Sequence, residues 1–133
     1  MEFNEKHFKK PTYVLSDKDL RWNRFIEEIS VKELCELNDI QKTAALAFCY
    51  HAHCCNGGHS CYIDCFPDIN PTELSNALIV LGFDDIAYNY QQAVLHGEED
   101  DCVKADEYFD KTENSLCNRI MEYVELYRDS IFP

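Results

Sequence analysis

Apolar residues recur at steps of three and four along most of this chain, the spacing that places side chains on one face of an α-helix. One such stripe near the beginning contains Leu20, Trp22, Phe25, Ile26 and Ile29. Another near the end contains Leu116, Ile120, Val124, Tyr127 and Ile131. No segment alternates apolar and polar residues in the way that predicts a strand. The pattern therefore predicts an all-α protein.

The helical pattern begins after Pro11 and continues to the last residues. A chain of 133 residues has the ordinary size of one domain, so we expect a compact single-domain bundle of about six to seven helices over residues 15–133. Residues 1–14 carry mixed charge and predict an irregular N-terminal arm.

Side-chain caps mark where the helices begin. Three pairs have the spacing of a capping box, in which each side chain accepts a hydrogen bond from the backbone of the other residue: Ser16 and Asp19, Ser30 and Glu33, and Asn38 and Gln41. The second pair predicts that the chain restarts after Ser30 into a short helical turn. The run Asn70-Pro71-Thr72-Glu73 is the clearest start, with a cap, a proline in the first turn and a nearby carboxylate.

The segment from Asp39 to about Cys55 is apolar nearly all round, which predicts a central buried helix. We expect Asn56-Gly57-Gly58 to end it, because Asn and Gly tolerate the left-handed conformation that closes a helix. A short helix around Tyr62, ended by Pro67, should follow.

Two further helices form a predicted hairpin joined at Gly82. The first starts at Asn70, and the second starts at Asp84 or Asp85 and is terminated by Gly97. The acidic run Glu98–Asp101 favours the N-terminus of the next helix, where carboxylates interact with the positive end of the helix dipole.

The composition favours an intracellular protein. The first residues lack an apolar core long enough for a signal peptide, and the longest apolar stretch, Ala77–Phe83, is too short to cross a bilayer. We therefore expect a cytoplasmic protein with no membrane contact, whose eight cysteines are reduced and mostly buried.

The formal charge of −13 is concentrated in one half of the chain. Residues 1–65 contain ten Asp and Glu against eight Lys and Arg, a net charge of −2, whereas residues 66–133 contain fifteen against four, a net charge of −11. This balance disfavours direct binding to nucleic acid and favours a basic protein partner. The candidate binding residues are Asp84, Asp85, Glu98, Glu99, Asp100, Asp101, Asp106, Glu107, Asp110 and Glu113. The alternative is that the acidity only maintains solubility.

The segment from Cys49 to Cys65 contains eight His and Cys side chains, so zinc is the metal to consider. Residues four apart share a helix face, which makes pairs of Cys49 with His53, His51 with Cys55, and Cys61 with Cys65. The candidate ligands are Cys49, His53, Cys61 and Cys65. Paired C-x-x-C knuckles are absent, and helical cysteines commonly serve packing, so we expect no metal or other cofactor.

No catalytic motif is recognisable. A thiol enzyme would need a low-pKa cysteine beside a base, and the Asn-Gly-Gly stretch is too short for a phosphate-binding loop. We therefore expect no enzyme activity.

The order of features from Leu37 to about Phe132 resembles the family typified by DNA-mimic protein nineteen, a family of small acidic bacterial proteins. The resemblance is carried by a helix ending in Asn56-Gly57-Gly58, by the aromatic Tyr62-Ile63, and by the helices that begin at Pro71 and Ile86. It implies an all-helical fold and a homodimer. For the typifying member it also implies an acidic surface that occupies the DNA-binding face of a transcription regulator.

The chain departs from that family after Asn-Gly-Gly. Relatives tend to carry an aromatic residue, Gln and Asn where this chain has His59, Cys61 and Cys65. The leading hypothesis is a non-enzymatic, acidic protein-binding module that acts as a DNA mimic against a basic DNA-binding regulator. The alternatives are an immunity protein against a basic toxin nuclease and a structural zinc- or thiol-containing protein.

Overall fold

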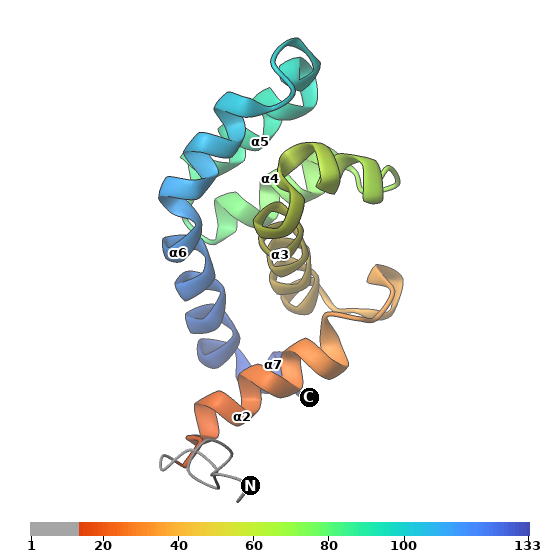
Figure 1. The fold of residues 1–133 in the computed structure, drawn as a ribbon. Coiled ribbons are helices and arrows are strands. Elements are labelled where there is room, and N and C mark those ends of the chain that lie inside the picture. The colour runs from red at the N-terminus through yellow and green to blue at the C-terminus, as the bar shows by residue number, and fades with distance from the viewer. Residues whose placement is uncertain (1–13) are drawn as a thin grey trace, which may run out of the picture.

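The computed structural model describes residues 14–133 (Figure 1). Within this range the chain forms helices and no strand, which confirms the predicted all-α bundle. The α-helices are α2 (Asp17–Arg24), α3 (Asp39–Cys65), α4 (Pro71–Val80), α5 (Asp84–His96), α6 (Val103–Leu126) and α7 (Arg128–Ile131). Between them lie the π-helix η1 (Phe25–Ile29) and the 3-10 helices η2 (Leu34–Glu36) and η3 (Gly97–Glu99). The predicted arm, residues 1–14, falls outside the described residues apart from Val14.

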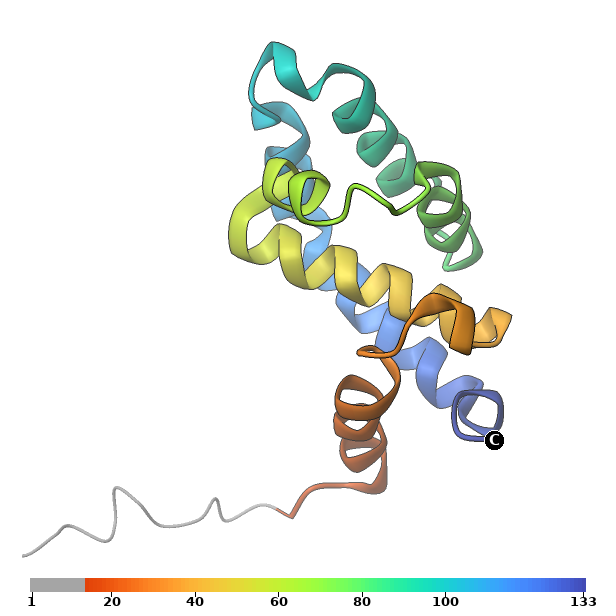
Figure 2. The same cartoon turned by 90° about the vertical axis from the view of Figure 1, so that its right-hand side faces the viewer.

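Helix α3 lies at the centre of the bundle, as its apolar sequence predicts (Figure 2). It packs against α6, α4 and α7, and residues 44–47 are all buried, so its neighbours surround it. The predicted capping box fixes its start. Asn38 Oδ1 accepts a hydrogen bond from Gln41 N at 2.8 Å, and Gln41 Oε1 accepts one from Asn38 N at 2.9 Å.

The Asn-Gly-Gly motif bends α3. Gly58 has φ 73° and ψ −174°, a conformation essentially restricted to glycine, so the predicted break in the helix is confirmed. No loop follows the break, because helical structure resumes at once and continues to Cys65. Phe66 then ends the helix, directly before Pro67 as predicted.

Helices α4 and α5 form the predicted hairpin. Asn70 Oδ1 accepts a hydrogen bond from Thr72 N at 2.9 Å, and Pro71 opens the first turn. Gly82 joins the two helices with φ 96°. Gly97 follows α5 as predicted, but its φ of −59° is right-handed, so the chain continues into η3 instead of reversing there.

The acidic run Glu98–Asp101 lies before α6, although the sequence predicts it at the N-terminus of that helix. Asp101 and Cys102 both have positive φ, 54° and 62°, so helical geometry begins only at Val103. One carboxylate nevertheless acts at the helix end, since Asp100 Oδ2 accepts a hydrogen bond from Lys104 N at 3.1 Å.

Helix α6 is a single amphipathic helix of 24 residues. The predicted C-terminal helix therefore begins earlier than its stripe from Leu116 suggests, and a break at Tyr127 separates it from α7. No helix within residues 14–133 is long and apolar enough to span a membrane.

Of the two capping boxes predicted near the N-terminus, one is confirmed and one is wrong, although the short helical turn predicted after Ser30 is present as η2. Ser16 Oγ accepts a hydrogen bond from Asp19 N at 3.1 Å, and Asp19 Oδ2 accepts one from Ser16 N at 3.1 Å, as a capping box requires. Ser30 makes no such box with Glu33. Its hydroxyl donates back to the Ile26 carbonyl at 2.6 Å, because Ser30 closes the π-helix and does not open a new one.

All eight cysteines lie within the described residues as free thiols. Only Cys54 and Cys102 are buried, and Cys35, Cys55 and Cys65 are exposed. The prediction that most of the thiols are buried is therefore wrong. The reason is geometric: several sit on the outer faces of helices whose inner faces are filled by larger apolar residues.

Candidate functional site

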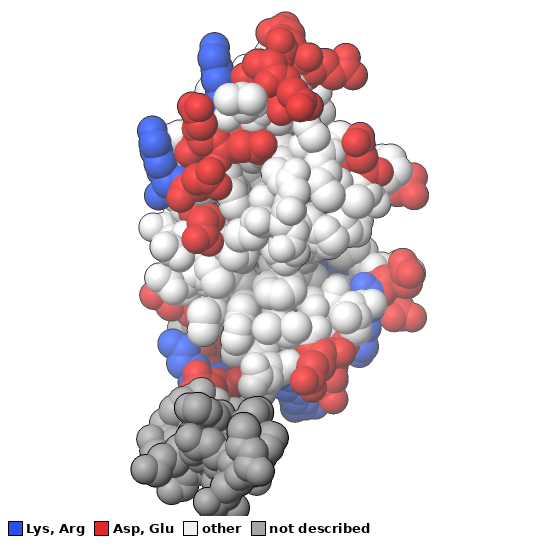
Figure 3. All heavy atoms as spheres, in the orientation of Figure 1, with Lys and Arg blue, Asp and Glu red and all other residues white. Residues whose placement is uncertain are grey.

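The ten candidate acidic residues do not form one continuous patch. Glu98, Glu99, Asp100 and Asp101 are consecutive at the turn between α5 and α6, and we call these four residues the acidic end. Figure 3 shows Asp and Glu side chains gathered there and over the adjoining part of α6. Asp84 and Asp85 lie in the first turn of α5, at the other end of that helix.

Six of the ten carboxylates make hydrogen bonds or ion pairs inside the molecule. Three belong to the acidic end: Asp100 accepts from Lys104 N, Asp101 from the Ser60 hydroxyl at 3.3 Å, and Glu99 contacts His96.

The other three lie outside the acidic end. Asp106 and Glu113 bind His59 and His51 across the α3–α6 interface. Asp85 accepts a hydrogen bond from the Tyr108 hydroxyl. The exposed members of the set are Asp84, Asp85, Glu98, Glu99, Asp101, Glu107 and Asp110.

From residue 14 onward, the lysines near the acidic end form no ion pair with it, whereas His96 Nδ1 lies 3.3 Å from Glu99 Oε1. Lys104 and Lys111 are both exposed on α6, and neither forms an ion pair with any residue in the part of the chain that the structure describes. Arg119 lies farther along α6, where it donates to the Leu81 carbonyl and pairs with Glu122.

A polar relay joins α3 to α6; its tyrosine and histidine are buried, whereas the Asp106 side chain is 36% exposed. The Tyr50 hydroxyl lies 2.6 Å from His59 Nε2, and His59 Nδ1 lies 2.8 Å from Asp106 Oδ1. The same carboxylate oxygen accepts the His59 backbone N–H at 2.9 Å. Because a carboxylate only accepts, Nδ1 carries the imidazole proton and Nε2 accepts from the Tyr50 hydroxyl.

The glycine motif makes this relay possible. A Cβ on Gly58 would lie 2.5 Å from Asp106 Oδ2, and a Cβ on Gly57 would lie 2.6 Å from Cys61 Cβ. The bend at Gly58 turns the His59 N–H and ring toward α6. The motif therefore has a structural role in this chain, whereas Asn56 is exposed to solvent.

The relay is closed to substrates. Tyr50 and His59 are 0% exposed, and aromatic rings surround Tyr50 edge-on, including Tyr62, Tyr90 and Phe109 at centroid distances of 5.3, 5.5 and 5.7 Å. Burial raises the pKa of Tyr50 well above its ordinary value, which keeps the hydroxyl protonated as a donor. These features make the relay a fixed part of the core.

The relay predicts a dependence of stability on pH. Burial lowers the pKa of His59 below 6.5, although the hydrogen bond and charge of Asp106 act in the opposite direction. As the pH falls through about 6.5, the unfolded chain therefore binds a proton that the folded chain does not, and the free energy of unfolding decreases by at most about 1.4 kcal/mol per pH unit. The decrease ends below the lowered pKa of His59.

Urea unfolding at a series of pH values measures this slope. A His59→Gln variant should lose the part of the slope contributed by His59 while retaining the contributions of the other histidines and of the carboxylates. Identical slopes in the two proteins would contradict the assignment.

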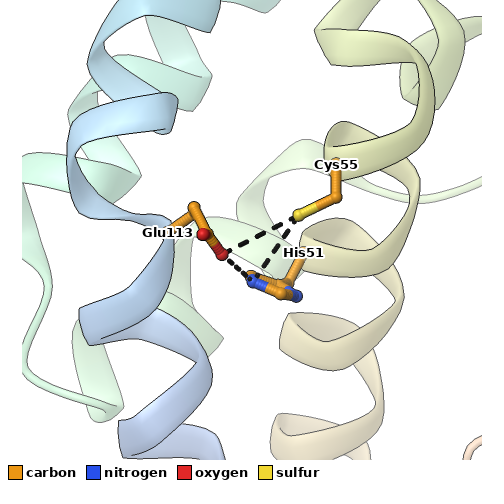
Figure 4. A group of neighbouring side chains, drawn as sticks. All are labelled: His51, Cys55 and Glu113. Atoms are coloured by element: carbon orange, nitrogen blue, oxygen red, sulfur yellow. Dashed lines mark hydrogen bonds and ion pairs between the residues drawn. The ribbon is translucent and has the colours of Figure 1, made fainter.

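A second group of polar side chains lies on the same interface, nearer its surface. His51 Nε2 lies 2.8 Å from Glu113 Oε2, and Cys55 Sγ lies 3.7 Å from that nitrogen and 3.9 Å from that oxygen. Figure 4 shows His51 and Cys55 extending from α3 toward Glu113 on α6. Partial desolvation, followed by the charge of Glu113, raises the pKa of Cys55.

The structure does not bring the four candidate metal ligands together. His53 packs edge-on against Phe66 at 4.6 Å between ring centroids, and Cys61 Sγ lies 3.9 Å from Cys65 Sγ. Among the described residues, the group of three or more His, Cys, Asp and Glu ligand atoms within 4.8 Å of one another is His51, Cys55 and Glu113. The sequence pairs His51 with Cys55 through their spacing, but nothing local to that pair indicates Glu113.

Most thiols are poor nucleophiles in this environment. Burial raises the pKa of Cys49, Cys54, Cys102 and Cys117, and the hydrogen bond with Cys61 raises that of Cys65. A reactive cysteine requires the opposite shift, toward the thiolate.

No family model matches the chain, and searches of the curated proteins and of the solved structures find no significant match. The resemblance to the DNA-mimic family therefore stays a prediction, as does the homodimer that it implies.

Proposed function

We propose that this protein is a non-enzymatic, acidic protein-binding module whose acidic end, Glu98 to Asp101, binds a basic protein. The observation that carries the proposal is the charge of the exposed Glu98, Glu99 and Asp101 at the turn between α5 and α6, with which no Lys or Arg of residues 14–133 forms an ion pair. Such a surface attracts basic partners and repels nucleic acid phosphates.

Two features of the relay and of the thiols support a binding role over catalysis. The Tyr50–His59–Asp106 relay resembles a catalytic triad in its hydrogen bonds, but its tyrosine and histidine are inaccessible to substrate. The thiols with shifted pKa values are shifted toward the protonated form, which disfavours nucleophilic attack.

In its finer form, the proposal is a DNA mimic that blocks the DNA-binding face of a regulator. The exposed carboxylates Glu107 and Asp110 extend the charge of the acidic end along α6, as a row of phosphates extends along DNA. An immunity protein that neutralises a basic nuclease would use the same surface. If duplex DNA competes with this protein for its partner, both forms are supported. The effect on the partner distinguishes them, because a blocked regulator stops binding DNA, whereas a neutralised nuclease stops cutting it.

Removing three charges at the acidic end should weaken partner binding. We expect Glu98→Gln, Glu99→Gln, Asp101→Asn to reduce the affinity about tenfold at low salt, since each exposed charge pair contributes about 0.5 kcal/mol. Asparagine tolerates the positive φ of residue 101. The partner is captured from native lysate with the wild-type chain, and its dissociation constant is then measured with purified proteins.

The matched control removes three exposed charges elsewhere, with Glu27→Gln, Glu33→Gln, Glu36→Gln. This control should retain wild-type affinity. Wild-type binding should also weaken steeply between about 0.1 M and 1 M salt, as the screening length falls from about 10 Å to about 3 Å. Affinity that is independent of salt, or equal losses in the two triple variants, would refute the proposed surface.

A further inference from the structure

The group formed by His51, Cys55 and Glu113 presents one imidazole nitrogen, one thiol sulfur and one carboxylate oxygen to a common point (Figure 4). These three donor types occur together in zinc sites, because Zn²⁺ accepts nitrogen, sulfur and oxygen ligands. Magnesium and calcium prefer oxygen alone. We propose that His51 Nε2, Cys55 Sγ and Glu113 Oε2 form a zinc-binding site between α3 and α6, which is independent of the acidic end.

The distances fit a tetrahedral ion with a small adjustment. Zinc bond lengths of about 2.0–2.3 Å place neighbouring tetrahedral donors about 3.4–3.6 Å apart. The sulfur lies 3.7 Å from the nitrogen and 3.9 Å from the oxygen. The nitrogen and oxygen are closer, at 2.8 Å, because they share a hydrogen bond. An ion that replaces this hydrogen bond moves the two atoms apart by about 0.6 Å.

The supporting elements hold the donors in place. His51 and Cys55 lie four residues apart on α3 and share one face of that helix. The neighbouring Tyr50–His59–Asp106 relay fixes α3 against α6, and Glu113 follows Asp106 by two turns. The site therefore needs little reorganisation beyond its own side chains.

Access and charge also favour a cation. The His51 side chain is 13% exposed and that of Glu113 is 28% exposed, while Cys55 is exposed, so an ion can enter from solvent. Asp110 lies one turn before Glu113 and adds negative charge near the Cys55 thiol. Three protein ligands leave a fourth position for water. On binding, the thiol releases its proton to the buffer and the sulfur coordinates the ion as a thiolate. His51 takes the tautomer with its proton on Nδ1, which frees a lone pair on Nε2, the nitrogen that had donated the hydrogen bond to Glu113.

The test uses the full-length, tag-free, reduced chain freed of metal. Zinc affinity is measured by competition with a chromophoric chelator, and cobalt substitution reports thiolate ligation through a charge-transfer band in the near ultraviolet. We expect one zinc ion per chain. Cys55→Ser should lower the affinity for zinc by more than about 10- to 100-fold, the loss that is typical when a residue that only orients a metal ligand is replaced. It should also abolish the cobalt band.

Cys65→Ser is the matched control, since it removes another exposed thiol from the same helix. It should retain both the affinity and the band. Glu113→Gln should weaken zinc binding like Cys55→Ser, and zinc should raise the melting temperature of the wild type but not of either variant. Circular dichroism without metal checks that each variant is folded. Equal zinc affinity in wild type and Cys55→Ser, or a cobalt band that disappears only in Cys65→Ser, would overturn the proposal.

Discussion

Replacing Gly58 with alanine is expected to lower the free energy of unfolding by about 2 to 6 kcal/mol. Two causes add. The φ of 73° with ψ −174° strains any residue that has a Cβ, which costs about 1–3 kcal/mol. The new Cβ would also lie 2.5 Å from Asp106 Oδ2, so Asp106 must move away from His59. The buried N–H donors of His59 then lose their acceptor, which costs about 1–3 kcal/mol more.

Gly82→Ala is the matched control for the backbone part of this effect. Gly82 also has a positive φ, 96°, but a Cβ there would meet no atom within 4 Å. Urea unfolding of both variants, measured against wild type, should give the larger loss for Gly58→Ala. Equal losses would show that contact with Asp106 contributes nothing, and no loss at Gly58 would contradict the bend itself.

Asp106→Ala should destabilise the fold by about 2 to 5 kcal/mol, because it removes the acceptor of two hydrogen bonds at once. Both donors belong to His59, which is 0% exposed, while the Asp106 side chain is 36% exposed. Asp106→Asn retains a carbonyl oxygen at the same place, so its loss should be smaller. Thermal or urea unfolding measures the difference.

The neighbouring residue provides the control for this prediction. Glu107 is exposed, so Glu107→Ala should change stability by no more than about 0.5 kcal/mol. If Asp106→Ala were as mild as Glu107→Ala, the relay would not be a fixed part of the core. The comparison also separates folding from binding, because both residues are candidate partner contacts in the sequence.

The local features of the fold could be predicted from the sequence. The boxes at Ser16 and Asn38 and the start at Asn70 depend only on residues two or three positions away, and the structure contains all three. Ser30 has the same spacing to Glu33 but donates to Ile26 instead. The π-helix that ends at Ser30 accounts for this difference, and a capping pattern does not predict it.

The interface between α3 and α6 could not be predicted in the same way. Asp106 follows His59 by 47 residues, and no short-range pattern indicates that the two meet. The same holds for Glu113 and His51. The spacing of cysteines and histidines alone selected Cys49, His53, Cys61 and Cys65, but the bend at Gly58 redirects the second half of the helix.

The polar relay has a consequence for recognition. Because Tyr50 and His59 on α3 are buried and His59 donates two hydrogen bonds to Asp106 on α6, the two helices cannot slide past each other without breaking these bonds. The carboxylates on α6 therefore keep the separations set by its rise of about 1.5 Å per residue. A basic partner, as proposed, would meet a preorganised template, so the conformational entropy that α6 itself loses on binding would be confined to its side chains.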